Sequence, residues 1–269
     1  MNRTHPPLSG PPPSEVPLAS APLVRVIAQV RFPMIASVER REFIAPFQEA
    51  IRKEYAVLRQ EQSRNVVLGG QGIAETHSTT IWRFLDTSSS WTVTLAPEFV
   101  ALQTSRYTSR DDFLDRFRRI LEALEAHIDP RVVDRLGVRY IDRVEEENLA
   151  DLPQLVRPEV SGILGTPLFE HARHSLSESL LDLPDGSGLV KARWGLMPSG
   201  GTVDPAALEP VEGRSWLLDL DAFKVFENAE TELDVDGMLS RARTFAERIY
   251  SIFRWTVTDE FLRRYGGRP

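Results

Sequence analysis

The sequence predicts an α+β protein built from two related β-α-β-β-β-α halves, each an antiparallel sheet packed on a long amphipathic helix. Two observations lead to this prediction. Segments with alternating apolar residues, typical of strands, are interrupted by three stretches in which apolar residues recur at helical spacing. Short sequence matches also occur in the same order in the first and second parts of the chain.

Composition excludes several classes of protein. The chain has 269 residues, 42% of them hydrophobic, and a net charge of −7, so its length suits one large domain or two small ones. The acidic balance disfavours general nucleic-acid binding, which depends on basic residues that neutralise phosphates. With no cysteine, disulfides, thiolate metal sites and cysteine nucleophiles are excluded. No secretory signal and no apolar run of about 20 residues is evident, so we expect a cytoplasmic protein that does not associate with membranes.

The chain is expected to begin with a segment that does not join the core. Seven of the 19 prolines fall in residues 1–22, which contain few large apolar residues. Such a segment buries too little surface to offset the entropy lost on ordering. We predict a disordered or polyproline-like leader, and a proline motif for a partner is the alternative.

The first half is predicted to span residues 23–130 and the second residues 131–269, and we expect the two to pack as one compact unit. In the first we expect strands at 23–32, 65–72, 79–85, 91–95 and 99–103, a helix within 38–58 that starts or kinks at Pro46, and a helix after Thr108 and Ser109. In the second we expect strands at 132–144, 175–183, 189–197 and 215–220, a long helix capped by Asp234 or Asp236, and a short helix at 258–265.

The internal matches carry the prediction of a duplication. They pair Val30-Arg31-Phe32 with Val138-Arg139-Tyr140, Trp82-Arg83 with Arg193-Trp194, and the strand that starts at Trp91 with the one that starts at Trp216. Because the matches keep one order, a repeated α+β unit explains them. A sheet that wraps a helix often leaves a pocket between the two, which favours a ligand-binding hypothesis.

Six side chains are the candidate ligand-binding residues. Four are arginines within predicted strands, and two are nearby aspartates: Arg31, Arg83, Arg139, Arg193, Asp142 and Asp219. A strand arginine either lines a cleft for an anionic ligand or forms a structural ion pair, since a buried guanidinium needs an acceptor. Asp142, Asp219 and Glu98 are the partners expected under the structural interpretation, which we favour.

Other candidate sites are weaker. Asp219 and Asp221 share a strand face and could hold Mg²⁺, and His171 and His174 could share a metal, but no further ligand is apparent for either pair. Gly69-Gly70-Gln71-Gly72 lacks the lysine of a phosphate-binding loop and indicates a turn. We therefore predict no metal site and no cofactor, and no residue is identified as catalytic.

The run Arg135-Leu136-Gly137-Val138-Arg139-Tyr140-Ile141-Asp142-Arg143 resembles the signature of a sporadically distributed family of prokaryotic proteins with no established function. The segments from Ala21 to Pro33, from Trp91 to Tyr107 and from Leu218 to Phe223 also resemble that family, so the similarity covers most of the chain beyond the leader. The resemblance implies no activity, cofactor or catalytic residue.

The sequence favours a non-enzymatic protein that binds a partner protein or a small ligand. The absence of catalytic motifs and the proline-rich leader support this hypothesis. The alternative is an enzyme that acts on an anionic, nucleotide-like substrate through the strand arginines and an aspartate. The expected partners are another protein or a small anion, and the sequence is compatible with a homodimer.

Overall fold

The computed structural model describes residues 6–69, 72–184, 186–226 and 231–269. Antiparallel strand pairs and six α-helices in these residues confirm the α+β class. The chain divides into two compact units that do not follow chain order. Unit 1 contains Met1–Val26, Val138–Lys224 and Arg243–Pro269, and unit 2 contains Ile27–Gly137 and Val225–Ala242.

Unit 2 contains five strands in the order β2-β3-β4-β5-β1. They are β1 (Leu23–Arg31, in this unit from Ile27), β2 (Val57–Gly69), β3 (Gly72–Leu85), β4 (Trp91–Ala96) and β5 (Phe99–Thr104). The predicted hairpin is confirmed, since β3 and β4 pair antiparallel with Leu85 opposite Thr92. Every residue of β4 is buried, which explains its short, apolar sequence.

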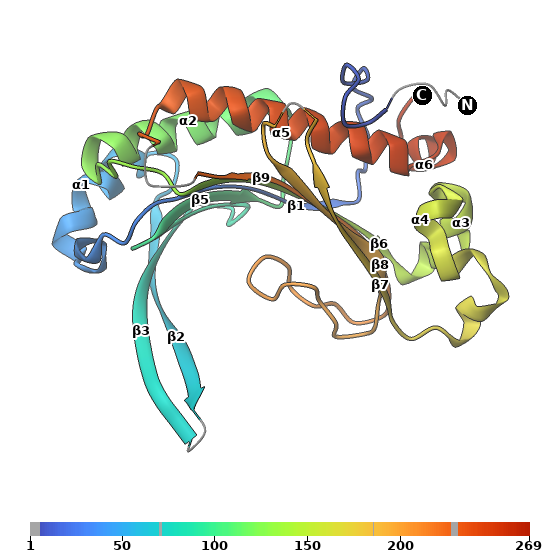
Figure 1. The fold of residues 1–269 in the computed structure, drawn as a ribbon, viewed down its shortest axis with the longest axis horizontal. Coiled ribbons are helices and arrows are strands. Elements are labelled where there is room, and N and C mark those ends of the chain that lie inside the picture. The colour runs from blue at the N-terminus through green and yellow to red at the C-terminus, as the bar shows by residue number, and fades with distance from the viewer. Residues whose placement is uncertain (1–5, 70–71, 185, 227–230) are drawn as a thin grey trace. The chain divides into compact units, whose positions relative to one another are not determined.

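The hairpin of β2 and β3 is longer than the sequence predicted, and Figure 1 shows the two strands as a long curved ribbon. Strand β3 pairs with β4 only over residues 82–85, whereas its pairing with β2 continues to Gly72. Residues 57–62 are exposed apart from Leu58 and are polar from Arg59 onward, so they lack the alternation that identifies a half-buried strand. Gly70 and Gln71 of the predicted turn lie outside the described residues.

The helices of unit 2 pack on these strands through aromatic side chains. They are the 3-10 helix η1 (Ala36–Glu39), α1 (Arg41–Ile51) and α2 (Arg110–His127). Helix α1 begins before Pro46 and contains it, so the helix does not start at the proline. The Trp91 ring stacks on Phe113 of α2 at 5.9 Å between centroids. The Ser109 hydroxyl accepts a hydrogen bond from the Asp112 amide at 3.1 Å and caps α2 as predicted.

Unit 1 contains four strands in the order β6-β9-β8-β7. They are β6 (Arg135–Glu145, in this unit from Val138), β7 (Ser175–Asp182), β8 (Leu189–Met197) and β9 (Ser215–Val225, in this unit to Lys224). Gly195 permits β7 and β8 to lie close together, because a Cβ at this position would lie 1.9 Å from the Ser175 carbonyl oxygen.

The helices of unit 1 lie in two parts of the sequence, directly after β6 and at the C-terminal end. They are η2 (Glu146–Asp151), α3 (Leu152–Leu155), α4 (Pro158–Ser161), η3 (Gly162–Gly165), η4 (Pro167–His171), α5 (Val235–Thr256, in this unit from Arg243) and α6 (Asp259–Arg264). Figure 1 shows α5 on one side of the strands and the segment that joins β8 to β9 on the other.

The described part of the proline-rich leader lies against α5 and the end of α6. Arg248 Nη1 donates to the Gly10 carbonyl at 2.6 Å, and the Val16 amide donates to the Tyr250 hydroxyl at 2.7 Å. The Ser20 amide donates to the carbonyl of Tyr265 at 3.2 Å. These bonds use backbone groups that a proline-rich chain leaves unpaired, because it forms neither helix nor sheet.

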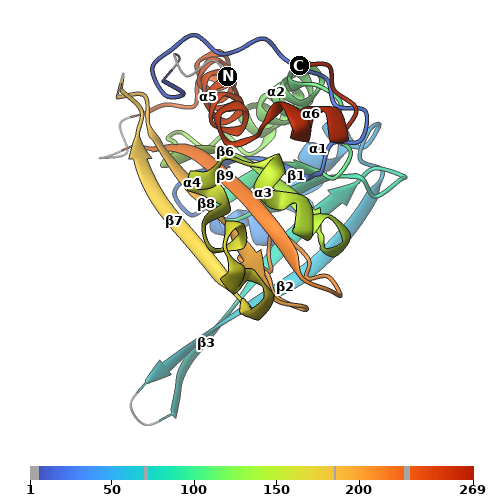
Figure 2. The same ribbon diagram turned by 90° about the vertical axis from the view of Figure 1, so that its right-hand side faces the viewer.

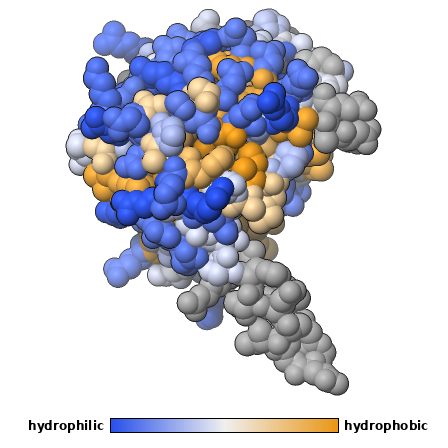
Figure 3. Space-filling model, turned by 90° about the vertical axis from the view of Figure 1, so that its left-hand side faces the viewer, coloured by the Kyte–Doolittle hydropathy of each residue, from blue (hydrophilic) through white to orange (hydrophobic). Residues whose placement is uncertain are grey.

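The exterior is mostly polar. Figure 3 shows one face on which hydrophilic residues surround a smaller hydrophobic area. Among the described residues, no helix combines the length and the apolar character required to cross a bilayer.

Candidate functional site

Two of the predicted arginines meet at one buried carboxylate in unit 1. Arg139 of β6 donates from Nε and Nη2 to the two oxygens of Asp219 at 2.7 and 2.9 Å. Arg193 of β8 donates from Nε and Nη2 to Asp219 Oδ2 at 3.0 and 2.6 Å. Asp219 lies on β9, directly opposite Arg193, and is 1% exposed. Strand order therefore brings together three residues that are distant in the sequence.

The charges in this cluster are compensated from within the chain. Burial opposes ionisation of Arg139, but hydrogen bonds and charge from Asp219 and Asp204 outweigh it and hold the arginine pKa above its ordinary value. Two guanidinium groups and the carboxylates of Asp219 and Asp204 leave no net charge. Each guanidinium therefore has a carboxylate partner within the chain, which is the arrangement expected of a structural ion-pair network.

The same cluster fastens the segment between β8 and β9, residues 198–214, which we call the β8–β9 loop. Arg139 Nη1 donates to Asp204 Oδ2 of this loop at 2.6 Å. Burial raises the pKa of Asp204, but the hydrogen bond and charge of Arg139 more than offset that effect and lower it overall. A second arginine of β6, Arg143, donates from Nη2 to the Glu209 carbonyl at 2.7 Å. Strand β6 thus holds the loop at two points.

The loop is also closed by its own hydrogen bonds. The Gly200 amide donates to the Val211 carbonyl at 2.9 Å, and the Gly213 amide donates to Ser199 Oγ at 3.2 Å. Near its middle, Leu208 is 3% exposed. The two ends of the loop are therefore held side by side in a fixed arrangement.

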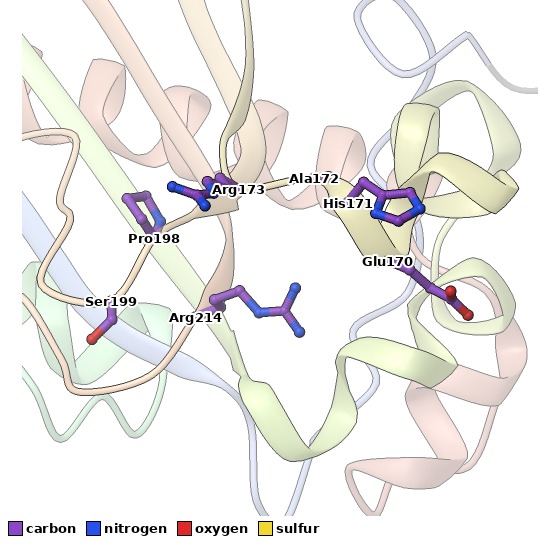
Figure 4. Close-up of a pocket in the computed structure, with 7 residues that line it drawn as sticks. All are labelled: Glu170, His171, Ala172, Arg173, Pro198, Ser199 and Arg214. Carbon is purple, nitrogen blue, oxygen red and sulfur yellow. The ribbon is translucent and has the colours of Figure 1, made fainter.

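These two ends form one wall of a cavity of about 410 Å³, which we call the loop cavity. Its lining residues come from the loop ends, from the end of η4 and from the residues that follow η4: Glu170, His171, Ala172, Arg173, Pro198, Ser199 and Arg214. Figure 4 shows the Arg214 side chain extending from the end of the β8–β9 loop toward the segment that carries Glu170 and His171.

Glu146, the first residue of η2, sets the position of Arg214. Its Oε1 accepts from Arg214 Nε at 3.1 Å, and its Oε2 accepts from the Arg214 amide at 3.0 Å. Both bonds lower the pKa of Glu146, and the bond from the Arg214 backbone amide has the larger effect. Gly213 makes this approach feasible, because it adopts φ +90° and a Cβ there would lie 2.9 Å from Glu146 Oε2. Arg214 is thus oriented through Nε and its backbone.

Two cationic groups at the cavity have few partners within the protein. They are the terminal nitrogens of Arg214 and the guanidinium of Arg173. Among the described residues, neither group has an ion pair or hydrogen bond beyond those from Arg214 Nε and its amide to Glu146. The Arg214 guanidinium also lies over the Phe169 ring, 5.5 Å from its centroid. A guanidinium held by one edge presents its other nitrogens to a ligand, which suits carboxylate or phosphate oxygens.

The other predicted site residues lie elsewhere. In unit 2, Arg31 pairs with Glu98 at 3.0 Å and Arg83 with Glu61 at 2.7 Å; the first pair is about half exposed, and the Arg83 side chain is 29% exposed. In unit 1, Asp142 is 6% exposed, and its burial raises its pKa to about 7. All four predicted arginines therefore have carboxylate partners, which is the arrangement expected for structural ion pairs.

Sequence reasoning missed Arg173 and Arg214 because neither lies in a conspicuous motif. His171 was considered only together with His174, yet the cavity contains the first and not the second. Within the part of the chain that the structure describes, no group of three or more histidine, aspartate or glutamate side chains is arranged to hold a metal ion. The signal in the sequence is the glycine- and proline-rich composition of residues 198–213, which is typical of an excursion between strands but does not indicate its role.

No protein-family model matches this chain, and a search of curated proteins finds none that is similar to it. Functional inference therefore depends on the geometry of the loop cavity.

Proposed function

We propose that this protein binds a small anionic ligand in the loop cavity and does not catalyse a reaction. The observation that carries the proposal is the pair of arginines, Arg173 and Arg214, at a cavity of about 410 Å³. This volume is in the range of small-molecule sites, roughly 300–1,000 Å³. His171 and the Ser199 hydroxyl supply further polar groups, whereas Glu170 disfavours a ligand with negative charge at its own side of the cavity.

The arrangement supports binding because the cavity wall is held in place before a ligand arrives. Arg139 and Arg143 fix the β8–β9 loop to β6, and Glu146 orients Arg214. A site that is ordered in advance loses less conformational entropy on binding. On this proposal Arg139 acts indirectly, by positioning the loop, and does not touch the ligand.

The test is ligand-induced stabilisation of the full chain. Inorganic phosphate, nucleotides and dicarboxylates are screened for a rise in melting temperature, and the affinity of any hit is measured by calorimetry. Replacing Arg173 by alanine should weaken binding by about 10–100-fold, because a charge-assisted hydrogen bond contributes roughly 1.5–3 kcal/mol. Melting temperature without ligand should change little, since Arg173 is exposed.

Two matched controls separate the cavity from general charge effects. Arg263→Ala removes another exposed arginine of the same unit, and His174→Ala removes the histidine that does not line the cavity. Both variants should bind the hit as the unaltered chain does. If no anion in the panel binds, or if Arg173→Ala and Arg214→Ala bind normally, the proposal is wrong.

The enzymatic alternative receives no support from this geometry. Asp219 accepts hydrogen bonds from two arginines and is nearly inaccessible, so it is poorly placed to act as a base on a substrate. We therefore keep the non-enzymatic proposal.

We further propose that the two chain halves arose by duplication, with each sheet packed on its long helix. Strand order supports this: β1, β5, β4 and β3 are successive neighbours in one half, and β6, β9, β8 and β7 are in the other. In each half the first strand lies beside the strand that precedes the long helix: β1 lies beside β5, which precedes α2, and β6 lies beside β9, which precedes α5. This correspondence pairs β3 with β7, β4 with β8 and β5 with β9, so of the three sequence matches only the one between β1 and β6 agrees with it.

Membership of the prokaryotic family suggested by the Arg135–Arg143 signature, and a cytoplasmic location, are further proposals. The resemblance along the chain supports the first, and the absence of cysteine is consistent with the second.

A further inference from the structure

We propose that the outer edge of β7 is a self-association surface, on which a second copy of this chain adds its own β7 antiparallel and in register at Ser179. The inference is independent of the loop cavity. It rests on the position of β7 in the sheet, on its exposed leucines, and on the placement of its two acidic residues.

Strand β7 ends the strand order, so β8 is its one hydrogen-bonded strand neighbour among the described residues. Figure 2 shows β7 along the outer side of β8. All eight residues, Ser175–Asp182, are regular strand, and none is proline. An edge of this kind presents unpaired amide and carbonyl groups that another strand can pair with.

The side chains of β7 add an apolar component to this edge. Leu176 is 43% exposed and Leu180 is 58% exposed. The even-numbered residues lie on one sheet face with Lys191 and Arg193, which are opposite Leu180 and Glu178 in β8. Two exposed leucines on one face of an edge strand would gain by burial against a partner strand.

The acidic residues select the register. In a symmetric antiparallel pair, a pairing centred on Glu178 aligns residues 175–181 but sets each Glu178 opposite its own copy, which is unfavourable. A pairing centred on Leu180 sets Glu178 opposite Asp182 and aligns only residues 178–182. A pairing centred on Ser179 aligns residues 176–182 and opposes no two acidic residues. It is therefore the register that combines long pairing with compatible charges.

In this register the leucines form one apolar group. Glu178 lies opposite Leu180 of the second copy, and Leu176 lies opposite Asp182. The two Leu180 side chains are then diagonal neighbours across the axis, and each Leu176 is diagonal to the other copy's Leu180, within reach for long side chains. Glu178 keeps its own compensation, because Arg193 Nε lies 4.0 Å from its carboxylate.

The decisive experiment uses the fact that the chain has no cysteine. In the proposed register Ser179 lies opposite its own copy, with Cα atoms about 4.5–5.5 Å apart, which suits a disulfide. Ser179→Cys should form a covalent dimer on mild oxidation. Ser177→Cys is the matched control: Ser177 lies opposite Leu181, so two copies of residue 177 are about 13 Å apart and cannot join.

The unaltered chain should show a concentration-dependent dimer by light scattering. Leu180→Glu should raise the dimer dissociation constant at least about tenfold, because the new carboxylate would lie opposite Glu178 of the second copy. Leu168→Glu, at a 60% exposed leucine outside β7, should not. The proposal fails if the chain is monomeric at high micromolar concentration. It also fails if the two cysteine variants cross-link to the same extent, or if Leu180→Glu dimerises like the unaltered chain.

Discussion

Arg31 and Arg83 in unit 2 and Arg139 and Arg193 in unit 1 are the same residue type in similar strand contexts, yet their surroundings differ. The Arg31 and Glu98 side chains are 47% and 52% exposed, whereas those of Arg139 and Asp219 are 13% and 1% exposed. The first pair is accessible to water and consists of one arginine and one acid. The second belongs to a buried network in which one carboxylate accepts hydrogen bonds from two arginines.

The difference shows that burial, and not sequence pattern, decides how much a strand arginine contributes to the stability of the fold. An exposed ion pair stabilises a fold by about 0–1 kcal/mol, because water solvates both charges once they separate. Breaking a buried pair costs about 3–5 kcal/mol, because the remaining charge is left without a partner in a medium that solvates it poorly. Four experiments test the effect of burial on charged residues, from the largest expected effect to the smallest.

Asp219→Ala should have the largest effect. It leaves Arg139 and Arg193 without their shared acceptor, so we expect the free energy of unfolding to fall by about 3–5 kcal/mol. Urea denaturation followed by circular dichroism measures the change. The matched control is Glu98→Ala, which removes an exposed acid from Arg31 and should cost under about 1 kcal/mol. Equal losses in the two variants would contradict the contrast.

Asp142→Asn tests a buried acid that burial alone perturbs. Its pKa of about 7 lies above the ordinary value of 3.8, so the folded state holds a proton that the unfolded state loses. The contribution of Asp142 to stability is therefore greatest below about pH 4, falls as pH rises toward 7, and then levels off. A difference of about three pKa units corresponds to about 4 kcal/mol.

The asparagine variant should lose most of this pH dependence and should be the more stable protein at pH 8. Denaturation midpoints at pH 4.5 and pH 8 measure the effect. A variant that keeps the full pH dependence of the unaltered chain would show that another group causes it.

Asp204→Ala should have an intermediate effect. It removes one hydrogen bond from Arg139 but leaves Asp219 in place, and Asp204 is 33% exposed, so we expect a loss of about 1 kcal/mol. The β8–β9 loop should become more susceptible to limited proteolysis, with new cleavage sites within residues 198–214. Unchanged cleavage would show that Arg143 and the loop's own hydrogen bonds suffice.

Arg31→Ala and Arg83→Ala should have the smallest effects. Each removes one partner of a pair whose acidic side chain is about half exposed, so each should change stability by less than about 1 kcal/mol. The same urea measurement applies. A loss above about 2 kcal/mol for either arginine would remove the distinction between the two regions.

The sequence predicted elements where burial leaves a pattern. Strand β8 occupies the predicted residues, and α2 begins after the predicted cap, because alternation and helical spacing follow the buried faces. The polar strand residues 57–62 were missed, since they owe their conformation to pairing with β3 and not to burial. Prediction failed where a partner strand alone decides the structure.

The candidate site shows a similar limit. Sequence identified Arg139, Arg193 and Asp219 because charged residues in an apolar strand are conspicuous. It did not identify Arg173 or Arg214, since what makes them interesting is a cavity formed by segments that lie far apart along the chain. Spacing along the sequence carries no information on such a convergence.

Asp219 also helps to fix the pairing register of the strands around it. Successive residues of a strand point to opposite faces, so a slip of one residue would place Leu218 or Leu220 opposite Arg193 and would move the carboxylate to the other face. Both arginines would then lose the buried carboxylate that they share, and β6, β8 and β9 would be misaligned at the same time. A single acidic residue thus excludes the neighbouring alignments of three strands.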